Sequence, residues 1–379
     1  MLIVSFITIL AISALYVPQP LLPVLSEQFA VSRDAAAALT TVAFLPLSIA
    51  PLLYGYILES FTPRQMLRVA VALLAVSEFV FFVADSFPVL LGLRLFQGML
   101  IPAMLTALMT YVSIETEPGL IRRSMAFYIA STIMGGFLGR LLSGVIATLF
   151  GWRYSFLVLG ISLIVGFFLL GRLKAGSRPQ TIKPKADLIL TILRQKSFLK
   201  IYVTVFCFFF VFAAIMNFLP FRMTELDNAA TEMRIGFMYF GYALGIVTAI
   251  YAVRISDRIG GPVPAMVIGL ACYGLALSGM IVSDVLVLFV FMFLFCGSLF
   301  LVHSTASGHI NSLAEKNKGM VNGLYVSFYY GGGMFGSSLP GLVYREWGWT
   351  AFIICLLCIV LFGLITALTL LPTRRNIGV

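Results

Sequence analysis

Residues 135–152 read GGFLGRLLSGVIATLFGW, and residues 332–349 read GGMFGSSLPGLVYREWGW. Glycines and the final tryptophan occupy the same places in both stretches, 197 residues apart. The chain has 379 residues, so this spacing predicts two parallel copies of one unit. Two parallel copies of an apolar unit favour a transporter over a soluble enzyme. The repeated glycines that we expect at helix contacts are Gly135, Gly136, Gly139 and Gly144 in the first copy, and Gly332, Gly333, Gly336 and Gly341 in the second.

The composition indicates a membrane protein. Apolar residues make up 61% of the chain and charged residues 11%, against roughly 25% charged in soluble proteins. Lipid replaces the polar surface that such a chain lacks. We find no metal-ligand cluster and no nucleotide or hydrolase motif, so we expect no cofactor, no bound metal and no enzymatic activity. The net charge of +10 does not indicate nucleic-acid binding, because its distribution has another cause.

Twelve stretches are long and apolar enough to cross the bilayer as helices, which takes about 20 residues. We therefore expect an all-α membrane protein with two pseudo-symmetric six-helix bundles, over residues 1–172 and 200–379, joined by a cytoplasmic linker at 173–199. The first span is expected to run as a helix past the two prolines near residue 19. The predicted spans are 3–25, 36–58, 66–84, 88–112, 124–148, 154–172, 200–221, 235–254, 263–283, 286–310, 319–343 and 350–371.

The basic residues predict the orientation of these spans. Even-numbered turns and the C-terminus hold 18 of the 25 lysines and arginines, while odd-numbered turns hold five. Because cytoplasmic loops are enriched in these residues, we expect both termini in the cytoplasm. The connector contains a stretch at 187–196 that is read either as a short helix on the inner leaflet or as a solvated linker.

Two turns resemble one motif of a known family. The sequence GYILESFTPR at 55–64 and RISDRIGG at 254–261 resemble the cytoplasmic GxxxDRxGRR loop of the major facilitator superfamily. RLFQGMLIPA at 94–103 looks like its RxxQGxxxP element, and GWRYSF at 151–156 and GWTAF at 348–352 are similar to its outer turns. The resemblance implies that the two cytoplasmic turns act as a conformational gate, with glycine reversing the backbone and an acid pairing with helix ends. The gate residues are Gly55, Glu59, Arg64, Asp257, Arg258 and Gly260.

The fifth span resembles the glycine-rich element of the antiporter branch of that superfamily. In this chain Arg140 follows Gly139, where that element usually has proline. The resemblance therefore implies close helix contacts that slide during transport.

Three charged side chains lie well inside predicted spans, namely Glu78, Arg94 and Arg140. Buried charges in a membrane normally pair or carry function. We expect all three at one depth, in the outer half of the first bundle. One interpretation makes Glu78 and Arg94 a permanent ion pair, and the other makes Glu78 a group that binds and releases protons. Arg94 and Arg140 leave net positive charge, which suits an anionic substrate group.

Further polar groups in predicted spans are candidates for the substrate cavity or for proton coupling. His303 is either a packing group or a titrating group of the second half, since histidine titrates near physiological pH. The candidates for the substrate cavity are Gln19, Asn217, Tyr325 and Tyr329.

These observations predict a proton-driven transporter that exports small amphipathic organic compounds by alternating access. The start YVPQPLLP at 16–23 looks like that of bacterial drug- and sugar-efflux permeases of the superfamily. The alternatives are an uptake symporter for a sugar or organic anion, and a non-transporting receptor or lipid scramblase on the same scaffold. We expect a monomer in the bacterial inner membrane, with the lipid bilayer, a small-molecule substrate and protons as partners and no nucleic acid.

Overall fold

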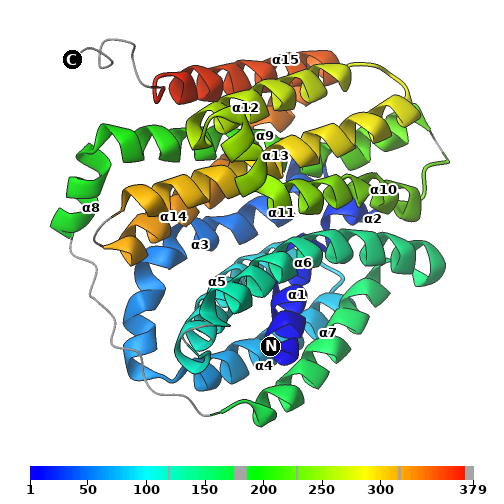
Figure 1. The fold of residues 1–379 in the computed structure, drawn as a ribbon. Coiled ribbons are helices and arrows are strands. Elements are labelled where there is room, and N and C mark those ends of the chain that lie inside the picture. Colours follow the sequence, from blue (N-terminus) through cyan, green and yellow to red (C-terminus); the bar gives the residue numbers. More distant parts are fainter. Residues whose placement is uncertain (118–119, 175–185, 228, 315–316, 372–379) are drawn as a thin grey trace, which may run out of the picture. The chain divides into compact units, whose positions relative to one another are not determined.

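The computed structural model describes residues 1–117, 120–174, 186–227, 229–314 and 317–371, without the side chains of 52–60, 121–123, 126 and 186. Every regular element in these ranges is helical (Figure 1). The chain forms two compact units: unit 1 comprises Met1–Lys183 and Met216–Phe240, and unit 2 comprises Pro184–Ile215 and Gly241–Val379. The predicted domain boundaries at 172 and 200 stay a prediction, because much of the 173–199 connector lies outside the described residues.

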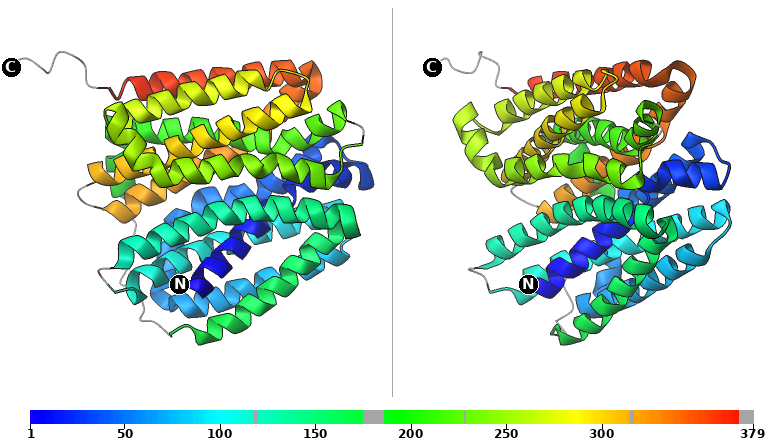
Figure 2. Two further views of the ribbon diagram at one scale, coloured as in Figure 1. Left: turned by 45° about the vertical axis from the view of Figure 1, so that its right-hand side comes forward. Right: turned by 90° about the vertical axis from the view of Figure 1, so that its right-hand side faces the viewer.

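Within each unit the helices run side by side, as the two views of Figure 2 show. In unit 1, α1 packs against α5, α6 and α7, and α4 packs against α5 and α7. In unit 2, α13 packs against α11, α12 and α14. The long helices are α1 (Leu2–Tyr16), α3 (Arg33–Ser60), α4 (Pro63–Val83), α5 (Phe87–Glu115), α6 (Ile121–Phe150), α7 (Trp152–Leu169), α9 (Lys196–Leu226), α11 (Tyr242–Ile259), α12 (Pro262–Gly279), α13 (Val285–Leu313), α14 (Lys318–Gly336) and α15 (Leu339–Leu368). The short ones are η1 (Gln19–Leu21), α2 (Leu22–Gln28), η3 (Leu170–Arg172), α8 (Ala186–Arg194), α10 (Glu232–Met238) and η4 (Tyr239–Gly241).

The helices account for twelve membrane spans. Eleven helical stretches of the described chain are long and apolar enough to cross a membrane. The last of them, Lys318–Leu368, has 51 residues, more than twice what one span needs. It contains α14 and α15, and Gly348 interrupts α15 with a φ of 76°. This stretch therefore supplies two spans, and the predicted all-α fold with two six-helix bundles is confirmed.

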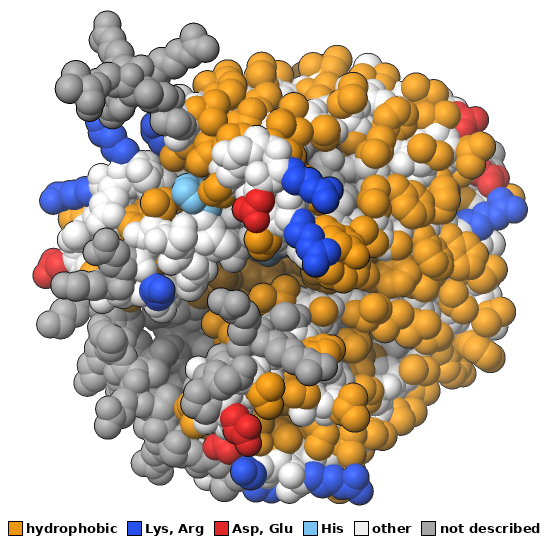
Figure 3. Space-filling view, viewed as in Figure 1, with side chains coloured by type: hydrophobic (Ala, Val, Ile, Leu, Met, Phe, Trp, Pro, Cys, Tyr) orange, Lys and Arg blue, Asp and Glu red, His pale blue; other side chains and the backbone are white. Residues whose placement is uncertain are grey.

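The surface is apolar, as a lipid-facing surface must be. Hydrophobic side chains cover most of the described surface in Figure 3. Among the exposed hydrophobic residues of the described chain, Phe168 is 72% exposed and Val253 is also 72% exposed. A soluble protein rarely exposes apolar patches of this extent, whereas lipid tails solvate them.

The predicted first span is confirmed as one stretch, Leu2–Gln28, but its helix is interrupted near the two prolines. Helix α1 ends at Tyr16, and the chain passes through a turn and η1 before α2 begins at Leu22. Pro18 and Pro20 explain the break, because proline has no N–H to donate to the carbonyl four residues earlier. The carbonyl groups of Ala14 and Tyr16 are the ones that lose their helical donors.

The repeated glycines make the same helix contact in each unit. In unit 1, a Cβ at Gly135 would lie 2.7 Å from the Ile9 carbonyl oxygen, and one at Gly139 would lie 2.7 Å from Ser13 Cα. Such distances exclude any side chain, so glycine lets α6 touch the backbone of α1. Gly144 makes a similar contact with Glu232 of α10.

In unit 2, Gly332 lies against the carbonyl of Phe206, and Gly336 lies against that of Phe210. Their partners on α9 follow Ile9 and Ser13 by the same 197 residues that separate the glycines. The internal repeat therefore preserves both sides of the helix contact.

A second repeated contact was not predicted from the sequence. Tyr128 of α6 donates a hydrogen bond to the Leu105 carbonyl of α5 at 3.1 Å. Tyr325 of α14 donates to the His303 carbonyl of α13 at 3.1 Å. The two tyrosines are 197 residues apart, and the two carbonyls 198. Each unit thus fixes its glycine-rich helix to the preceding span by the same bond.

The Gly–Trp pairs begin the last span of each half. Gly151 has a φ of 99° and Gly348 a φ of 76°, values that L side chains rarely adopt. The tryptophan that follows each glycine donates its indole N–H, Trp152 to Gln28 and Trp349 to the Met280 carbonyl.

The connector contains one described helix. Residues Ala186–Arg194 form α8, which covers most of the 187–196 stretch that we read either as a short helix or as a solvated linker, and α8 contacts α14. Residues 175–185 of the connector lie outside the described residues.

Candidate functional site

Arg94 is fully buried in unit 1 and binds the broken end of α1. Its NH1 donates to the Ala14 carbonyl at 2.8 Å, and its NH2 donates to the Leu15 carbonyl at 2.6 Å. Because Pro18 has no N–H, Ala14 has no helical donor, and Arg94 supplies one instead. The interruption of the helix at the prolines and the buried arginine are therefore linked, because Arg94 supplies a donor that the interruption removes.

Helix α5, which carries Arg94, packs closely against α3 at Gly98. A Cβ at Gly98 would lie 2.5 Å from the Ala43 carbonyl oxygen. One turn earlier on α5, Arg94 Nε donates to the Leu39 carbonyl at 2.9 Å. The guanidinium also donates to Gln97 Oε1 at 2.7 Å, and thus binds three carbonyls and one amide.

Glu78 of α4 lies in the same buried region, close enough to Arg94 and Gln97 to interact with both electrostatically, but without a salt bridge to Arg94 among the described residues. Both carboxylate oxygens are buried without a hydrogen-bond partner among the described residues. Gln97 connects Arg94 to α4: it accepts a hydrogen bond from the guanidinium and donates one to the Ser77 hydroxyl at 3.2 Å. The described residues therefore show no direct Glu78–Arg94 salt bridge, while the two charges still act on each other electrostatically, so both interpretations of Glu78 stay predictions. The N–H groups of Arg94 donate instead to carbonyls of α1 and α3, so they are not available to the Glu78 carboxylate.

Arg140 of α6 also lies at the end of α1, beside Tyr16 and Gln19. Its Nε donates to Gln19 Oε1 at 2.6 Å, and its NH1 donates to the Gly136 carbonyl at 2.6 Å. The guanidinium carbon lies 3.9 Å from the ring centre of Tyr16 and 5.3 Å from that of Tyr239. Two aromatic faces stabilise a desolvated cation by cation–π attraction.

Gln19 joins Arg140 to Asn217, which belongs to the part of α9 in unit 1. Gln19 Nε2 donates to Asn217 Oδ1 at 3.3 Å, and Asn217 Nδ2 donates to the Ala37 carbonyl at 3.1 Å. Gln19 and Asn217 are 198 residues apart, within one residue of the 197-residue spacing of the internal repeat. All three predicted residues are fully buried and form one chain of hydrogen bonds. We call Tyr16, Gln19, Arg140, Asn217 and Tyr239 the Arg140 cluster.

We predict that Gln19 and Asn217 stabilise the protein as a pair. Gln19→Leu and Asn217→Leu are each expected to lower the thermal stability of the purified protein. The double variant should lose less than the sum, with a coupling of roughly 0.5–1.5 kcal/mol for one buried hydrogen bond. Thermal unfolding of the four proteins measures this coupling, and strictly additive losses would show that the two amides act independently.

In unit 2, His303 lies in an aromatic cluster. Its Nδ1 lies 2.9 Å from the Tyr325 hydroxyl, and its ring centre is 4.9 Å from that of Tyr329 and 6.0 Å from that of Phe208. Tyr329 stacks on Phe209 with 3.6 Å between ring centres. The structure thus brings together three predicted residues in unit 2, and the Tyr325 hydroxyl lies within hydrogen-bond distance of both the carbonyl oxygen and Nδ1 of the same histidine.

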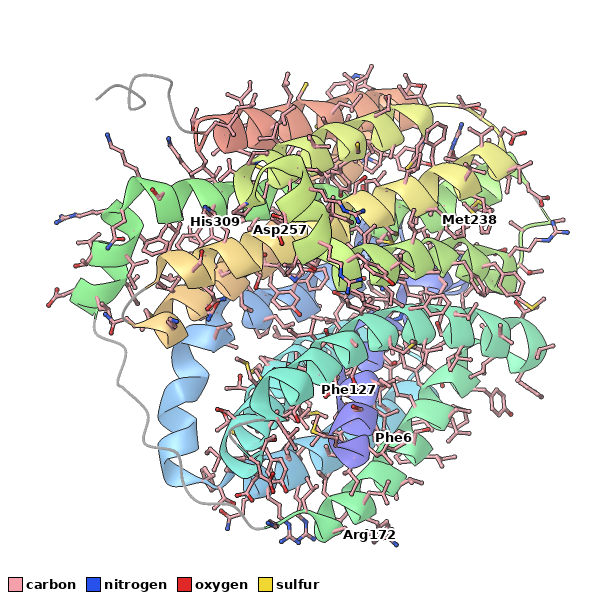
Figure 4. All side chains as sticks on the ribbon, viewed as in Figure 1. Phe6, Phe127, Arg172, Met238, Asp257 and His309 are labelled. Carbon is pink, nitrogen blue, oxygen red and sulfur yellow. The ribbon has the colours of Figure 1, made fainter. Side chains whose placement is uncertain are left out.

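The predicted gate residues are only partly described. Arg64 donates to the carbonyls of Leu170, at 3.2 Å, and Gly171, at 2.7 Å, where α7 and η3 end. Gly260 ends α11 with a φ of 102°, as the turn requires. Asp257 and Arg258 are exposed on the last turn of α11, where Figure 4 labels Asp257. The side chains of Gly55 and Glu59 lie outside the described residues.

Sequence reasoning missed the aromatic partners of Arg140 and the role of Gln97. Tyr16 and Tyr239 are far apart in the sequence, and nothing in their local pattern distinguishes them from packing residues. Tyr128 was detectable, because Tyr325 follows it at the spacing of the glycine repeat.

The sequence matches known transporters along its length. A family model described as Major Facilitator Superfamily matches residues 4–246 and 222–378. The inner membrane transport protein YnfM of Escherichia coli is 26% identical over 356 residues, which cover 92% of this chain and 85% of that protein. The uncharacterized MFS-type transporter YybF of Bacillus subtilis is 24% identical over 375 residues, covering 96% and 92%.

Solved structures share the fold at low sequence identity. A D-xylose-proton symporter aligns with a TM-score of 0.79 at 14% identity, over 100% of this chain and 98% of that chain. A bacterial homologue of the human lysosomal transporter Spinster, inward-facing and occupied, aligns with a TM-score of 0.75 at 14% identity, over 97% and 94%. The repeated halves, the twelve spans and the family match agree: the chain belongs to the major facilitator superfamily and is a multi-pass membrane transporter, not an enzyme.

Proposed function

We propose that this transporter is driven by protons and exports small amphipathic organic compounds by antiport. The observation that carries the proposal is Glu78, a fully buried carboxyl group beside Gln97 whose two oxygens accept no well-aligned hydrogen bond from the described residues. Burying a charged carboxylate in that position costs far more free energy than burying a protonated one. Glu78 therefore binds a proton in the state seen here and releases it when the helices rearrange.

Arg94 and Gln97 supply the surroundings that change during this step. The guanidinium is held by carbonyls of α1 and α3, and Gln97 lies between it and α4. A shift of the broken end of α1 changes which groups Arg94 binds. If Arg94 then turns towards Glu78, its charge favours loss of the proton. Proton release and helix movement are coupled in this way.

The test is Glu78→Gln, which keeps the shape of the side chain but cannot release a proton. Everted vesicles are energised, and a pH-sensitive dye reports whether lipophilic cations, sugars or organic acids dissipate the proton gradient. We expect wild-type protein to couple at least one compound to proton movement. Proton movement with Glu78→Gln is expected to fall to the level of vesicles without the protein, while the exposed control Glu346→Gln stays active. Full coupling in Glu78→Gln, with lowered thermal stability, would assign Glu78 a structural role.

The Arg140 cluster favours a second candidate, the uptake of an organic anion by symport. Its guanidinium is buried among amide and aromatic groups that also suit a carboxylate ligand. The same vesicle assay separates the two candidates, because the substrate and the proton move in opposite directions in antiport and together in symport. If neither the substrate nor protons moved across the membrane, the receptor or scramblase alternative would be favoured.

We further propose that both termini lie in the cytoplasm of a bacterial cell, in the inner membrane. The basic turns support this orientation. Asp257, Arg258 and Gly260 are proposed to form the gate on that side, together with Gly55, Glu59 and Arg64. Access of a membrane-impermeant thiol reagent to cysteines placed in the turns measures the orientation.

A further inference from the structure

A groove on the surface of unit 1 follows the line between α4 and α7. Its volume is about 460 Å³. Apolar side chains form most of its wall, and polar groups lie at the end where α4 begins. The residues that line it are Gln65, Arg68, Val69, Ala72, Leu73 and Phe167. Val69 is 60% exposed and Leu73 41% exposed, so the groove opens to the surroundings of the protein.

Positive charge gathers at the same end of the groove. The Arg68 guanidinium carbon lies 5.0 Å from the centre of the Phe167 ring, inside the groove. One turn earlier, Arg64 is anchored on the carbonyls of Leu170 and Gly171, and so holds the end of α7 beside the start of α4.

Arg172 and Lys174 follow directly on the chain and are exposed. Figure 4 labels Arg172 at this end of unit 1, and Figure 3 shows Lys and Arg side chains along the same edge. One acidic residue, Glu115 at the end of α5, also lies near this end, because Glu115 and Arg64 both act electrostatically on Tyr111. The edge therefore carries an excess of positive charge among the described residues.

We propose that this groove binds one anionic phospholipid of the cytoplasmic leaflet. The acyl chain lies along Val69, Ala72, Leu73 and Phe167, and the headgroup phosphate binds Arg68, with Arg172 and Lys174 nearby. The charge pattern selects this ligand, because a basic end on an apolar groove matches an anionic head on an apolar chain. A free phosphate ion would gain nothing from the apolar wall. The proposal is independent of the direction of transport.

The test measures lipid retention by the full-length protein in detergent. Native mass spectrometry counts phosphatidylglycerol and phosphatidylcholine molecules bound across a lipid titration. We expect one phosphatidylglycerol to bind more tightly than phosphatidylcholine. Arg68→Gln should weaken that lipid about fivefold, the effect of one basic residue at a membrane surface, and adding Arg172→Gln should weaken it further. The exposed control Lys318→Gln removes the same charge from unit 2 and should leave binding unchanged.

A second pair of variants tests the apolar wall. Ala72→Phe fills the groove and should reduce phosphatidylglycerol binding. Val76→Phe adds the same ring one turn further along α4, outside the groove lining, and should not. Both positions are partly or fully exposed, so both proteins should fold, and size-exclusion chromatography checks this.

Four results would overturn the proposal. Equal binding of the two lipids would remove the role of the headgroup charge. An equal loss in Lys318→Gln would indicate diffuse attraction rather than a site. Displacement of the lipid by inorganic phosphate at the same concentration would indicate a site for free anions. Unchanged binding in both Arg68→Gln and Ala72→Phe would place the lipid elsewhere.

Discussion

Replacing Arg94 by methionine is expected to destabilise the protein more than any other single change considered for this chain. The substitution leaves the carbonyls of Ala14 and Leu15 without the donors that Arg94 supplies, whereas the Leu39 carbonyl keeps its helical donor within α3. Each buried acceptor without a donor costs about 1–3 kcal/mol, so the total loss is roughly 2–6 kcal/mol. Thermal unfolding in detergent measures it. Arg345→Met, at a half-exposed arginine, is the matched control and should change stability by less than about 0.5 kcal/mol.

Pro18→Ala provides a way to test the physical cause. Alanine restores the N–H that can donate to the Ala14 carbonyl four residues earlier. In a Pro18→Ala background, Arg94→Met is therefore expected to cost less than in the wild-type background. Equal losses in the two backgrounds would show that Arg94 stabilises the fold by some other contact.

Gly336→Ala is expected to disrupt the contact between α14 and α9. The added Cβ would lie 2.7 Å from Phe210 Cα and closer still to its carbonyl, and backbone atoms move only with the whole helix. Forcing a methyl group into such a contact costs about 1–3 kcal/mol. Transport should fall as well, because the helices no longer pack as the repeat requires. Thermal unfolding and vesicle transport measure the two effects.

Gly331→Ala is the matched control on the same helix. Its Cβ would meet only the Phe206 ring, at 3.8 Å, which is ordinary contact. Alanine is about 1 kcal/mol better than glycine inside a helix, so this variant should be as stable as the wild type or more so. If both variants lost stability equally, helix composition rather than the close contact would explain the effect.

The glycine spacing predicted helix contacts but not what the glycines touch. Gly139 and Gly336 can be recognised because they repeat. Their partners Ser13 and Phe210 have different side chains, so the sequence does not mark them as equivalent. The contacts are with the backbone, so the partners need not resemble one another. The shared spacing of 197 residues connects them only after the contact is known.

For the buried charges, the sequence did not determine the binding partners. Arg94 and Arg140 both bind groups at or just after the end of α1 in unit 1, and the common depth expected for these two residues and Glu78 stays a prediction. A direct Glu78–Arg94 salt bridge was a reasonable expectation from depth alone. The described residues show none, because the prolines of the first span leave carbonyls that compete for Arg94, and that competition depends on where α1, α3 and α5 meet.

The sequence by itself determined the membrane fold and its duplication. Hydrophobicity and helix length are properties of consecutive residues, and the glycine repeat preserves spacing along the chain, so both can be read from the sequence. The tertiary structure decided which groups each charge binds. Arg140 meets Gln19 and Tyr16, and Arg94 meets backbone carbonyls, because helix packing sets which donors and acceptors lie within 3 Å of each other. Hydrogen bonds depend on distances between atoms far apart in the chain, and no local pattern records those distances.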